Sequence, residues 1–189
     1  MQLACESTDG ILANVTAEQL GLATPCDGWR VGDLIDHIVG AADFFADVAE
    51  HGASPAEREW PGYADGDFAA SFDASARRIL TAFAAPGAMD RTMMLPTGPT
   101  AGSRCLEVVI GEIFIHGWDL ARATGQLIPQ PAREGVADWL LASRWPVLCG
   151  EVRAADGSVF APALDVPDDA PAVDRLAAFL GRDPAWPGA

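Results

Sequence analysis

The side chains most able to do chemistry in this chain are its histidines. Only three histidines occur among the 189 residues. His116 follows Glu112 by four positions in the segment GEIFIHGWDL. Side chains four apart lie on one face of an α-helix, with Cβ atoms roughly 6 Å apart. His37 lies in another helix-like segment, DLIDHIVGAA. If these two helices face each other, His37, Glu112 and His116 converge on one point.

Two imidazoles and one carboxylate are a donor set typical of a catalytic metal site, because three protein ligands leave a coordination position open. The set suits zinc, and it also suits ferrous iron or nickel. The spacing by itself is not specific, since Glu-x-x-x-His occurs by chance in many helices. The alternative is a bundle without a metal, in which His116 forms a hydrogen bond across the interior and Glu112 is an ordinary, partly buried acid.

The elements that must position these side chains are helices. Apolar residues recur every three to four positions, which predicts four main helices. They span residues 2–15, 31–51, 67–85 and 103–124. Two shorter helices are predicted over 132–145 and 170–180, and a short hairpin over 152–161. Residues 86–102 contain several prolines and glycines, so we expect an irregular connection there.

This pattern predicts an all-α fold, a four-helix bundle with a short C-terminal extension of extra helices and a small hairpin. We expect the bundle to occupy residues 1–130 and the extension, residues 131–189, to pack on it. At 189 residues the chain has the length of one domain.

The net charge of −15, from 12 basic and 27 acidic residues, disfavours nucleic acid and anionic membrane surfaces as partners. No apolar run approaches the ~20 residues of a membrane span. The four cysteines form no CxxC pair, and the first residues do not resemble a secretion signal. We therefore expect a cytoplasmic protein with reduced thiols.

Three stretches together resemble a known family. They are Thr24-Pro25-Cys26-Asp27-Gly28-Trp29 with the following His37, the run from His116 to Gly125, and the tail from Phe160 to Pro184. The set is similar to the actinobacterial branch of the DinB-like superfamily, which includes the metal-binding N-terminal domain of mycothiol-dependent maleylpyruvate isomerase. The resemblance covers most of the chain and implies a DinB-type four-helix bundle that holds one divalent metal, usually zinc.

The resemblance also implies the ligands and the chemistry. The family's histidine on the second helix and Glu-x-x-x-His pair on the fourth map onto His37, Glu112 and His116. The implied activity is a mycothiol-dependent transferase or isomerase, in which the metal activates a small-molecule thiol toward an electrophilic substrate. The sequence departs from the isomerase in one respect. Only about 44 residues follow the fifth predicted helix, so we expect substrate contacts made by that enzyme's larger C-terminal domain to be missing.

Other residues have two interpretations each. Arg122 is the candidate catalytic cation, as a clamp for a substrate carboxylate, although a salt bridge with Asp119 is the favoured alternative. Cys105 could line a pocket, and Cys26 could be a reactive thiol near the start of a helix, but each is better explained as a packed residue. Asp33 could orient His37, although a first-turn acid also suits the helix dipole.

Three other functions stay open from the residues alone. They are a metal- or small-ligand-binding bundle without catalytic activity, a metal-dependent hydrolase, and a structural bundle without metal. A spare acid on the metal face would favour the hydrolase, and none is evident in the sequence. Relatives in the superfamily occur both as monomers and as homodimers, so either oligomeric state is compatible with the resemblance.

Overall fold

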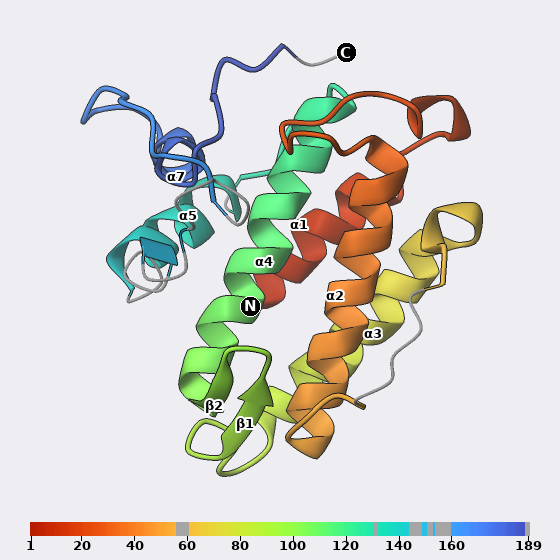
Figure 1. The fold of residues 1–189 in the computed structure, drawn as a ribbon, viewed down its shortest axis with the longest axis vertical. Helices are drawn as coiled ribbons and strands as arrows, with labels where there is room; N and C mark the ends of the chain where they lie inside the picture. The colour runs from red at the N-terminus through yellow and green to blue at the C-terminus, as the bar shows by residue number, and fades with distance from the viewer. Residues whose placement is uncertain (56–60, 131, 144–148, 151–152, 154–159, 188–189) are drawn as a thin grey trace.

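The computed structural model describes residues 1–55, 61–130, 132–143, 149–150, 153 and 160–187. These residues are mostly helical, as predicted (Figure 1). The α-helices are α1 (Gln2–Leu12), α2 (Val31–His51), α3 (Phe68–Ala84), α4 (Gly102–Ala123), α5 (Ala132–Ala142) and α7 (Ala172–Phe179). Two short 3-10 helices, η1 (Ala17–Gln19) and η2 (Tyr63–Asp65), lie in the connections. No described helix combines the length and the apolar character that crossing a bilayer requires.

Helices α1 to α4 form the bundle. Each contacts two others, because α2 packs on α3 and α4, and α1 packs on α3 and α4. In Figure 1, α2 and α3 run in one direction, while α1 and α4 run in the other. The core between them consists of the periodic apolar side chains, with Phe72, Leu34 and Phe114 fully buried. The second and fourth main helices therefore face each other, which is the condition for His37, Glu112 and His116 to converge.

The predicted helices agree with the observed ones to within a few residues. The prediction for α2 matches both ends, and α1 ends three residues earlier than expected, at Leu12. Helix α2 begins where the Asp33 carboxylate accepts the backbone N–H of Arg30, at 2.9 Å. It ends at Gly52, whose φ of 84° closes the last turn. The hairpin predicted for residues 152–161 lies almost wholly outside the described residues.

The prediction of an irregular connection over residues 86–102 is wrong. Strands β1 (Thr92–Leu95) and β2 (Gly98–Ala101) form an antiparallel hairpin in which Leu95 pairs with Gly98. Gly98 adopts a φ of 113°, a conformation that glycine allows, which explains why a glycine-rich segment can still pair. The Met93 side chain is fully buried and anchors the hairpin to the bundle. This hairpin lies at the end of the bundle where α4 begins (Figure 1).

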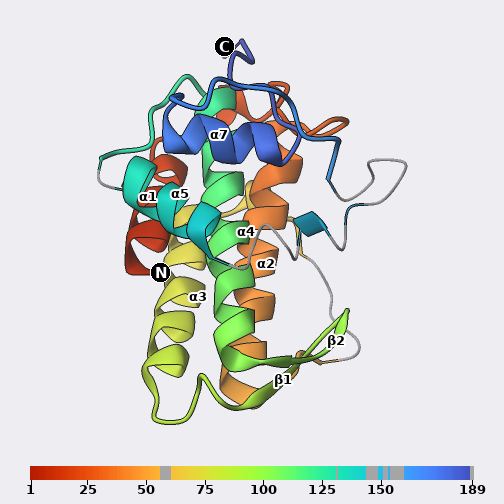
Figure 2. The same ribbon diagram turned by 90° about the vertical axis from the view of Figure 1, so that its left-hand side faces the viewer.

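The C-terminal helices cover one side of the bundle. Helices α5 and α7 pack against each other, and α5 also contacts α1 and α4 (Figure 2). The chain after α7 lies at the same end of the molecule as the connection between α1 and α2. The last described residues are thereby brought near the start of α2.

Helices α1 and α4 approach each other closely beside His116. The buried Thr8 hydroxyl of α1 donates a hydrogen bond to the Ile113 carbonyl of α4, at 3.0 Å. Thr8 also lies against Gly117, where a Cβ atom would overlap the threonine hydroxyl. The small size of Gly117 therefore sets the spacing of the two helices next to the candidate site.

Replacement of this glycine tests that contact. We expect Gly117→Ala to lower the free energy of unfolding by about 1–3 kcal/mol, because an extra methyl group overpacks the interface. Gly10→Ala is the matched control in α1, since nothing lies within 4 Å of its Cβ position. That control should gain about 0.5–1 kcal/mol from helix propensity. Urea denaturation measures both, and equal effects at the two glycines would contradict the close-contact argument.

Candidate metal centre and pocket

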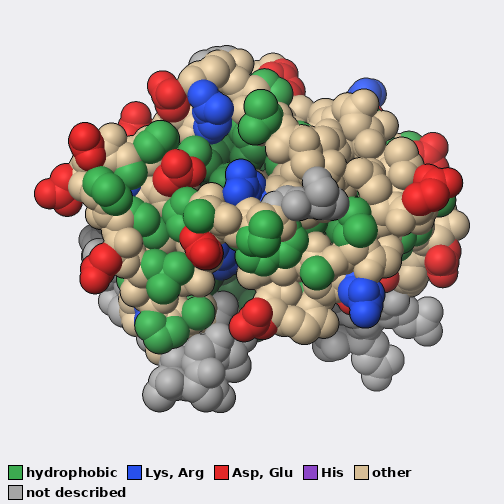
Figure 3. Space-filling model, turned by 90° about the horizontal axis from the view of Figure 1, so that it is seen from above, with side chains coloured by type: hydrophobic (Ala, Val, Ile, Leu, Met, Phe, Trp, Pro, Cys, Tyr) green, Lys and Arg blue, Asp and Glu red, His purple; other side chains and the backbone are tan. Residues whose placement is uncertain are grey.

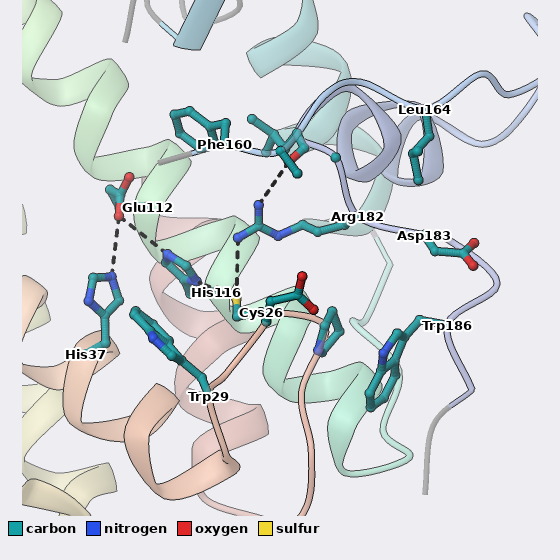
Figure 4. A pocket seen from close by; sticks show the side chains of 15 residues that line it. Cys26, Trp29, His37, Glu112, His116, Phe160, Leu164, Arg182, Asp183 and Trp186 are labelled. Carbon is teal, nitrogen blue, oxygen red and sulfur yellow. Dashed lines mark hydrogen bonds and ion pairs between the residues drawn. The ribbon is translucent and has the colours of Figure 1, made fainter. Parts of the chain in front are cut away.

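His37, Glu112 and His116 do come together. His37 extends from α2, while Glu112 and His116 lie one turn apart on α4. The Nε2 atoms of both histidines lie 3.6 Å from the same carboxylate oxygen, Oε2 of Glu112. The two imidazole rings are 4.6 Å apart and nearly perpendicular, at 75°. Figure 4 shows both rings directed at Glu112.

The spacing of these three atoms has the size of a metal coordination sphere. Ligand atoms bound at about 2.0–2.1 Å to one tetrahedral zinc lie roughly 3.4 Å from each other. The three donor atoms all lie within 4.8 Å of one another. Nε2 of His37 is also buried and has no hydrogen-bond partner. Buried polar atoms normally have a partner, so this nitrogen is suited to bind a ligand.

Asp119 holds the other side of the His116 ring. Its Oδ2 atom lies 3.1 Å from Nδ1 of His116, and the carboxylate is completely buried. A proton on Nδ1 then donates to Asp119, which fixes the ring so that Nε2 is directed at Glu112. A histidine oriented in this way by a carboxylate is a common arrangement behind metal ligands.

Arg182 neutralises the buried Asp119. Its Nε donates to Oδ1 of Asp119 at 2.8 Å, and its Nη2 donates to Oδ2 at 2.9 Å. Its Nη1 donates to the Leu180 carbonyl at 3.3 Å. Arg182 follows α7, so the C-terminal segment supplies the cation that a buried carboxylate on α4 requires.

The loop before α2 completes the site. The Thr24 hydroxyl accepts the backbone N–H of Cys26 at 3.1 Å and donates to the Trp29 carbonyl at 3.0 Å. This turn places the Cys26 thiol 3.1 Å from Oδ2 of Asp119 and 3.9 Å from Nδ1 of His116. It also places the Trp29 ring 4.8 Å from the ring of His37. The turn from Thr24 to Trp29 therefore contributes directly to the site.

The charges of the site stabilise one another. Burial alone would raise the pKa of Glu112, but its contacts with His116 and His37 hold that pKa well below its ordinary value. Burial alone would lower the pKa of His116, but its hydrogen bonds to Asp119, Cys26 and Glu112 raise it well above the usual range. Burial opposes ionisation of Asp119, yet the charge of Arg182 brings its pKa to about 2. Burial raises the pKa of Cys26, which therefore stays a thiol at neutral pH.

These residues form the floor of a cavity of about 540 Å³. That volume falls within the usual range of small-molecule sites, roughly 300–1,000 Å³. The cavity walls are mostly apolar and come from the loop before α2 and from the C-terminal segment, including Trp29, Phe160, Leu164, Leu180 and Trp186. Figure 4 shows Arg182 and Trp186 on the C-terminal side. The C-terminal segment thus supplies pocket contacts, despite the short chain after the fifth predicted helix.

Two other groups of ligand-type side chains are less suited to a metal. Asp47, Glu50 and His51 lie together at the end of α2. Arg78 of α3 already binds both acids, at 2.7 Å from Asp47 and 2.6 Å from Glu50. Cys26, Asp119 and His116 also lie together, but Arg182 binds the carboxylate there and lies 3.6 Å from the thiol. In each group an arginine of the protein already pairs with a carboxylate that a metal would need as a ligand.

The sequence candidates outside this cluster lie elsewhere. Arg122 donates to the Trp186 carbonyl at 2.6 Å and does not line the pocket, so neither the clamp nor the Asp119 salt bridge describes its contacts. Cys105 is completely buried, as expected, and burial raises its pKa to about 12. The Asp33 carboxylate accepts the Arg30 N–H at the start of α2. His51, the third histidine, is exposed at the end of α2.

Two functional side chains escaped the sequence analysis. Asp119 was considered only as a partner for Arg122, although its position three residues after His116 places it on a neighbouring part of the same helix face. Arg182 belongs to the tail that carries the resemblance, but its role depends on a contact across 63 positions of sequence. Only the structure shows that contact.

Comparison with known proteins decides the family. The family model of the mycothiol maleylpyruvate isomerase N-terminal domain matches residues 1–121, which include the loop before α2 and the three clustered side chains. The chain belongs to this family. The match ends before Arg182, so the cation that pairs with Asp119 lies outside the matched region.

Two solved structures share the fold of the present chain. A crystal structure of a histidine-to-alanine mutant of mycothiol-dependent maleylpyruvate isomerase has a TM-score of 0.59 and 19% identity, with 86% of this chain and 70% of that chain covered. A second crystal structure of mycothiol-dependent maleylpyruvate isomerase has a TM-score of 0.52 and 20% identity, with 78% and 69% covered. At this identity the likeness concerns the fold alone.

Relatives of higher identity carry no described activity in their names. The uncharacterized proteins Rv0738 and MT0763 of Mycobacterium tuberculosis are each 40% identical over 184 residues, with 96% of this chain and 94% of each relative covered. This similarity includes the C-terminal segment, which the family model does not match.

Removal of Arg182 tests the contact that joins the C-terminal segment to α4. We expect Arg182→Ala to lower the free energy of unfolding by about 3–5 kcal/mol, because Asp119 is left as an uncompensated buried charge. Arg175→Ala is the control, since its ion pair with Asp138 is exposed and contributes at most about 1 kcal/mol. Denaturant unfolding measures both variants.

The double variant Asp119→Leu with Arg182→Leu separates the charge from the packing. It should lose less stability than Arg182→Ala, because no buried charge remains. An Arg182→Ala loss no larger than that of Arg175→Ala would contradict the argument.

Proposed function

We propose that His37, Glu112 and His116 bind one divalent metal, with zinc as the first candidate. The observation that carries the proposal is the buried Nε2 of His37, which forms no hydrogen bond and lies at ion-pair distance from the same Glu112 oxygen as Nε2 of His116. Two neutral imidazoles and one carboxylate suit zinc, and also nickel or ferrous iron. The three side chains lie on two directly packed helices, so the chain arranges them before any ligand binds.

We infer further that this centre serves a low-molecular-weight thiol, with mycothiol as the thiol that the family suggests. A divalent metal bound there would supply Lewis-acid chemistry, which makes a coordinated thiol a thiolate at neutral pH. The reaction class is addition of the thiol to an electrophile. In an isomerisation the S–C bond forms and later breaks, which releases the thiol again. In an S-transfer the S–C bond is kept.

The residues of the chain have separate parts in this proposal. Asp119 holds the proton on Nδ1 of His116, and thereby keeps Nε2 available as a donor. Trp29 lies beside both histidine rings, at 4.8 and 6.0 Å, and restricts water on that side. The Cys26 thiol donates to Asp119 and remains protonated, so it does not replace an added thiol as the nucleophile.

Metal analysis tests the first part of the proposal. We expect close to one equivalent of zinc or another divalent metal in tag-free protein, by elemental analysis. His37→Ala, Glu112→Gln and His116→Ala should each lose most of it while keeping the helical circular dichroism. His51→Ala is the control, because this histidine is exposed at the end of α2. A wild-type protein that takes up neither zinc nor nickel would contradict the proposal.

Cobalt substitution tests the thiol. Mycothiol added to the cobalt protein should produce a sulfur-to-cobalt charge-transfer band, and S-methyl mycothiol should not, because it cannot form a thiolate. Cys26→Ser must give the same band, which assigns it to the added thiol rather than to the protein. A cobalt spectrum that mycothiol leaves unchanged would rule out thiol activation, and a metal-binding bundle without this chemistry would remain.

A further inference from the structure

The pocket has two chemically different parts. Its floor carries the proposed metal ligands, and its walls carry the aromatic rings of Trp29, Phe160 and Trp186 together with Leu164 and Leu180. A cavity of about 540 Å³ leaves room above the floor for a second molecule beside a thiol sulfur. The walls favour an apolar, ring-sized body in that space.

The arginine that lines the pocket already binds other groups of the protein. Arg182 is the sole basic residue among the described residues that line the cavity. Its Nε and Nη2 bind Asp119, its Nη1 binds the Leu180 carbonyl, and the side chain is only 11% exposed. Asp119 is completely buried and cancels the arginine charge locally. Arg182 is therefore a counter-ion of the protein rather than a free clamp for a substrate carboxylate.

Apart from this arginine, the cysteine and the two histidines on the floor, the ionisable side chains among the described residues that line the cavity are carboxylates. Glu112 faces the two histidines on the floor, while Asp27 and Asp183 are exposed residues of the lining. Asp183 accepts the backbone N–H of Ala185 at 2.8 Å, which fixes its carboxylate without neutralising it. Figure 3 shows this end of the molecule with acidic side chains around its edge. The chain as a whole carries a net charge of −15, which disfavours the long-range approach of an anion at low salt.

We propose that the pocket takes an electrophile with an apolar, ring-sized body and no negative charge, either neutral or cationic, and that it discriminates against dicarboxylates. This inference rests on the proposed function for the electrophile's role, but not for the binding preference itself. It separates this chain from the substrate named for the two structural neighbours, because maleylpyruvate carries two carboxylates. The bound pair Arg182–Asp119 and the free acids Asp27 and Asp183 determine the preference.

Three unreactive probes of related shape test the preference. They share the N-phenylsuccinimide scaffold rather than one exact size, and they are N-phenylsuccinimide, its 4-carboxyphenyl analogue and its 4-trimethylammoniophenyl analogue. Binding is followed by the NMR signals of the indole N–H groups of Trp29 and Trp186, which the variants Trp29→Phe and Trp186→Phe assign. The spectra are recorded on protein as purified and after zinc loading. We expect the neutral and cationic probes to bind, and the cationic probe to bind about five-fold or more tightly than the anionic one at low salt.

Charge variants assign the effect to the pocket. Asp27→Asn with Asp183→Asn should remove most of the difference between the charged probes. Glu6→Gln with Glu134→Gln changes the net charge equally at exposed positions that do not line the pocket, and should leave most of the difference in place.

Two outcomes would overturn the inference, namely tighter binding of the anionic probe, or no shift of either indole signal with any probe. Because the probes cannot react, the result is independent of thiol activation. A cobalt spectrum that mycothiol leaves unchanged, together with a clear preference among the probes, would therefore reject the proposed chemistry and support the pocket's selectivity. A new charge-transfer band without any preference among the probes would support the chemistry and reject the selectivity.

Discussion

The site depends on the neutralisation of one buried carboxylate. Asp119 is completely enclosed, and an enclosed carboxylate is strongly destabilising unless cations and hydrogen-bond donors surround it. Arg182 and His116 meet this requirement from two directions. The same contacts fix the ring of His116 and bring the segment after α7 onto the open end of the bundle. Orientation of the proposed metal ligand and closure of the pocket therefore follow from a single electrostatic constraint.

The sequence predicted those parts of the site that are local in the chain. The i, i+4 spacing of Glu112 and His116 and the helical periodicity around His37 were sufficient, because helix geometry alone places such side chains on one face. Helix ends were also predictable, since Asp33 and Gly52 are capping residues with local contacts. The facing of α2 and α4 needed only the general rule that apolar faces of neighbouring helices pack together.

The parts that escaped prediction depend on contacts distant in sequence or on a balance of weak local preferences. Arg182 reaches α4 from 63 residues away, and no spacing rule identifies such a pair. The hairpin of β1 and β2 contains two prolines that argue against strands, but the buried Met93 and the turn at Gly98 outweigh them. Arg122 was expected to form a salt bridge with Asp119 or another surface acid, whereas its guanidinium donates to the backbone carbonyl of Trp186, 64 positions away.

Membership in the family leaves the substrate open, for a physical reason. The family model matches residues 1–121, the part that provides the floor and the loop before α2. Most of the apolar wall, and the only arginine among the described lining residues, come from residues after that match. An arginine can recognise a substrate anion only with donors that are not already used, and those of Arg182 bind Asp119 and Leu180. The floor thus carries the side chains of the proposed metal site, whereas the wall from the later residues and the neutralised Arg182 shape the space in which a substrate would lie.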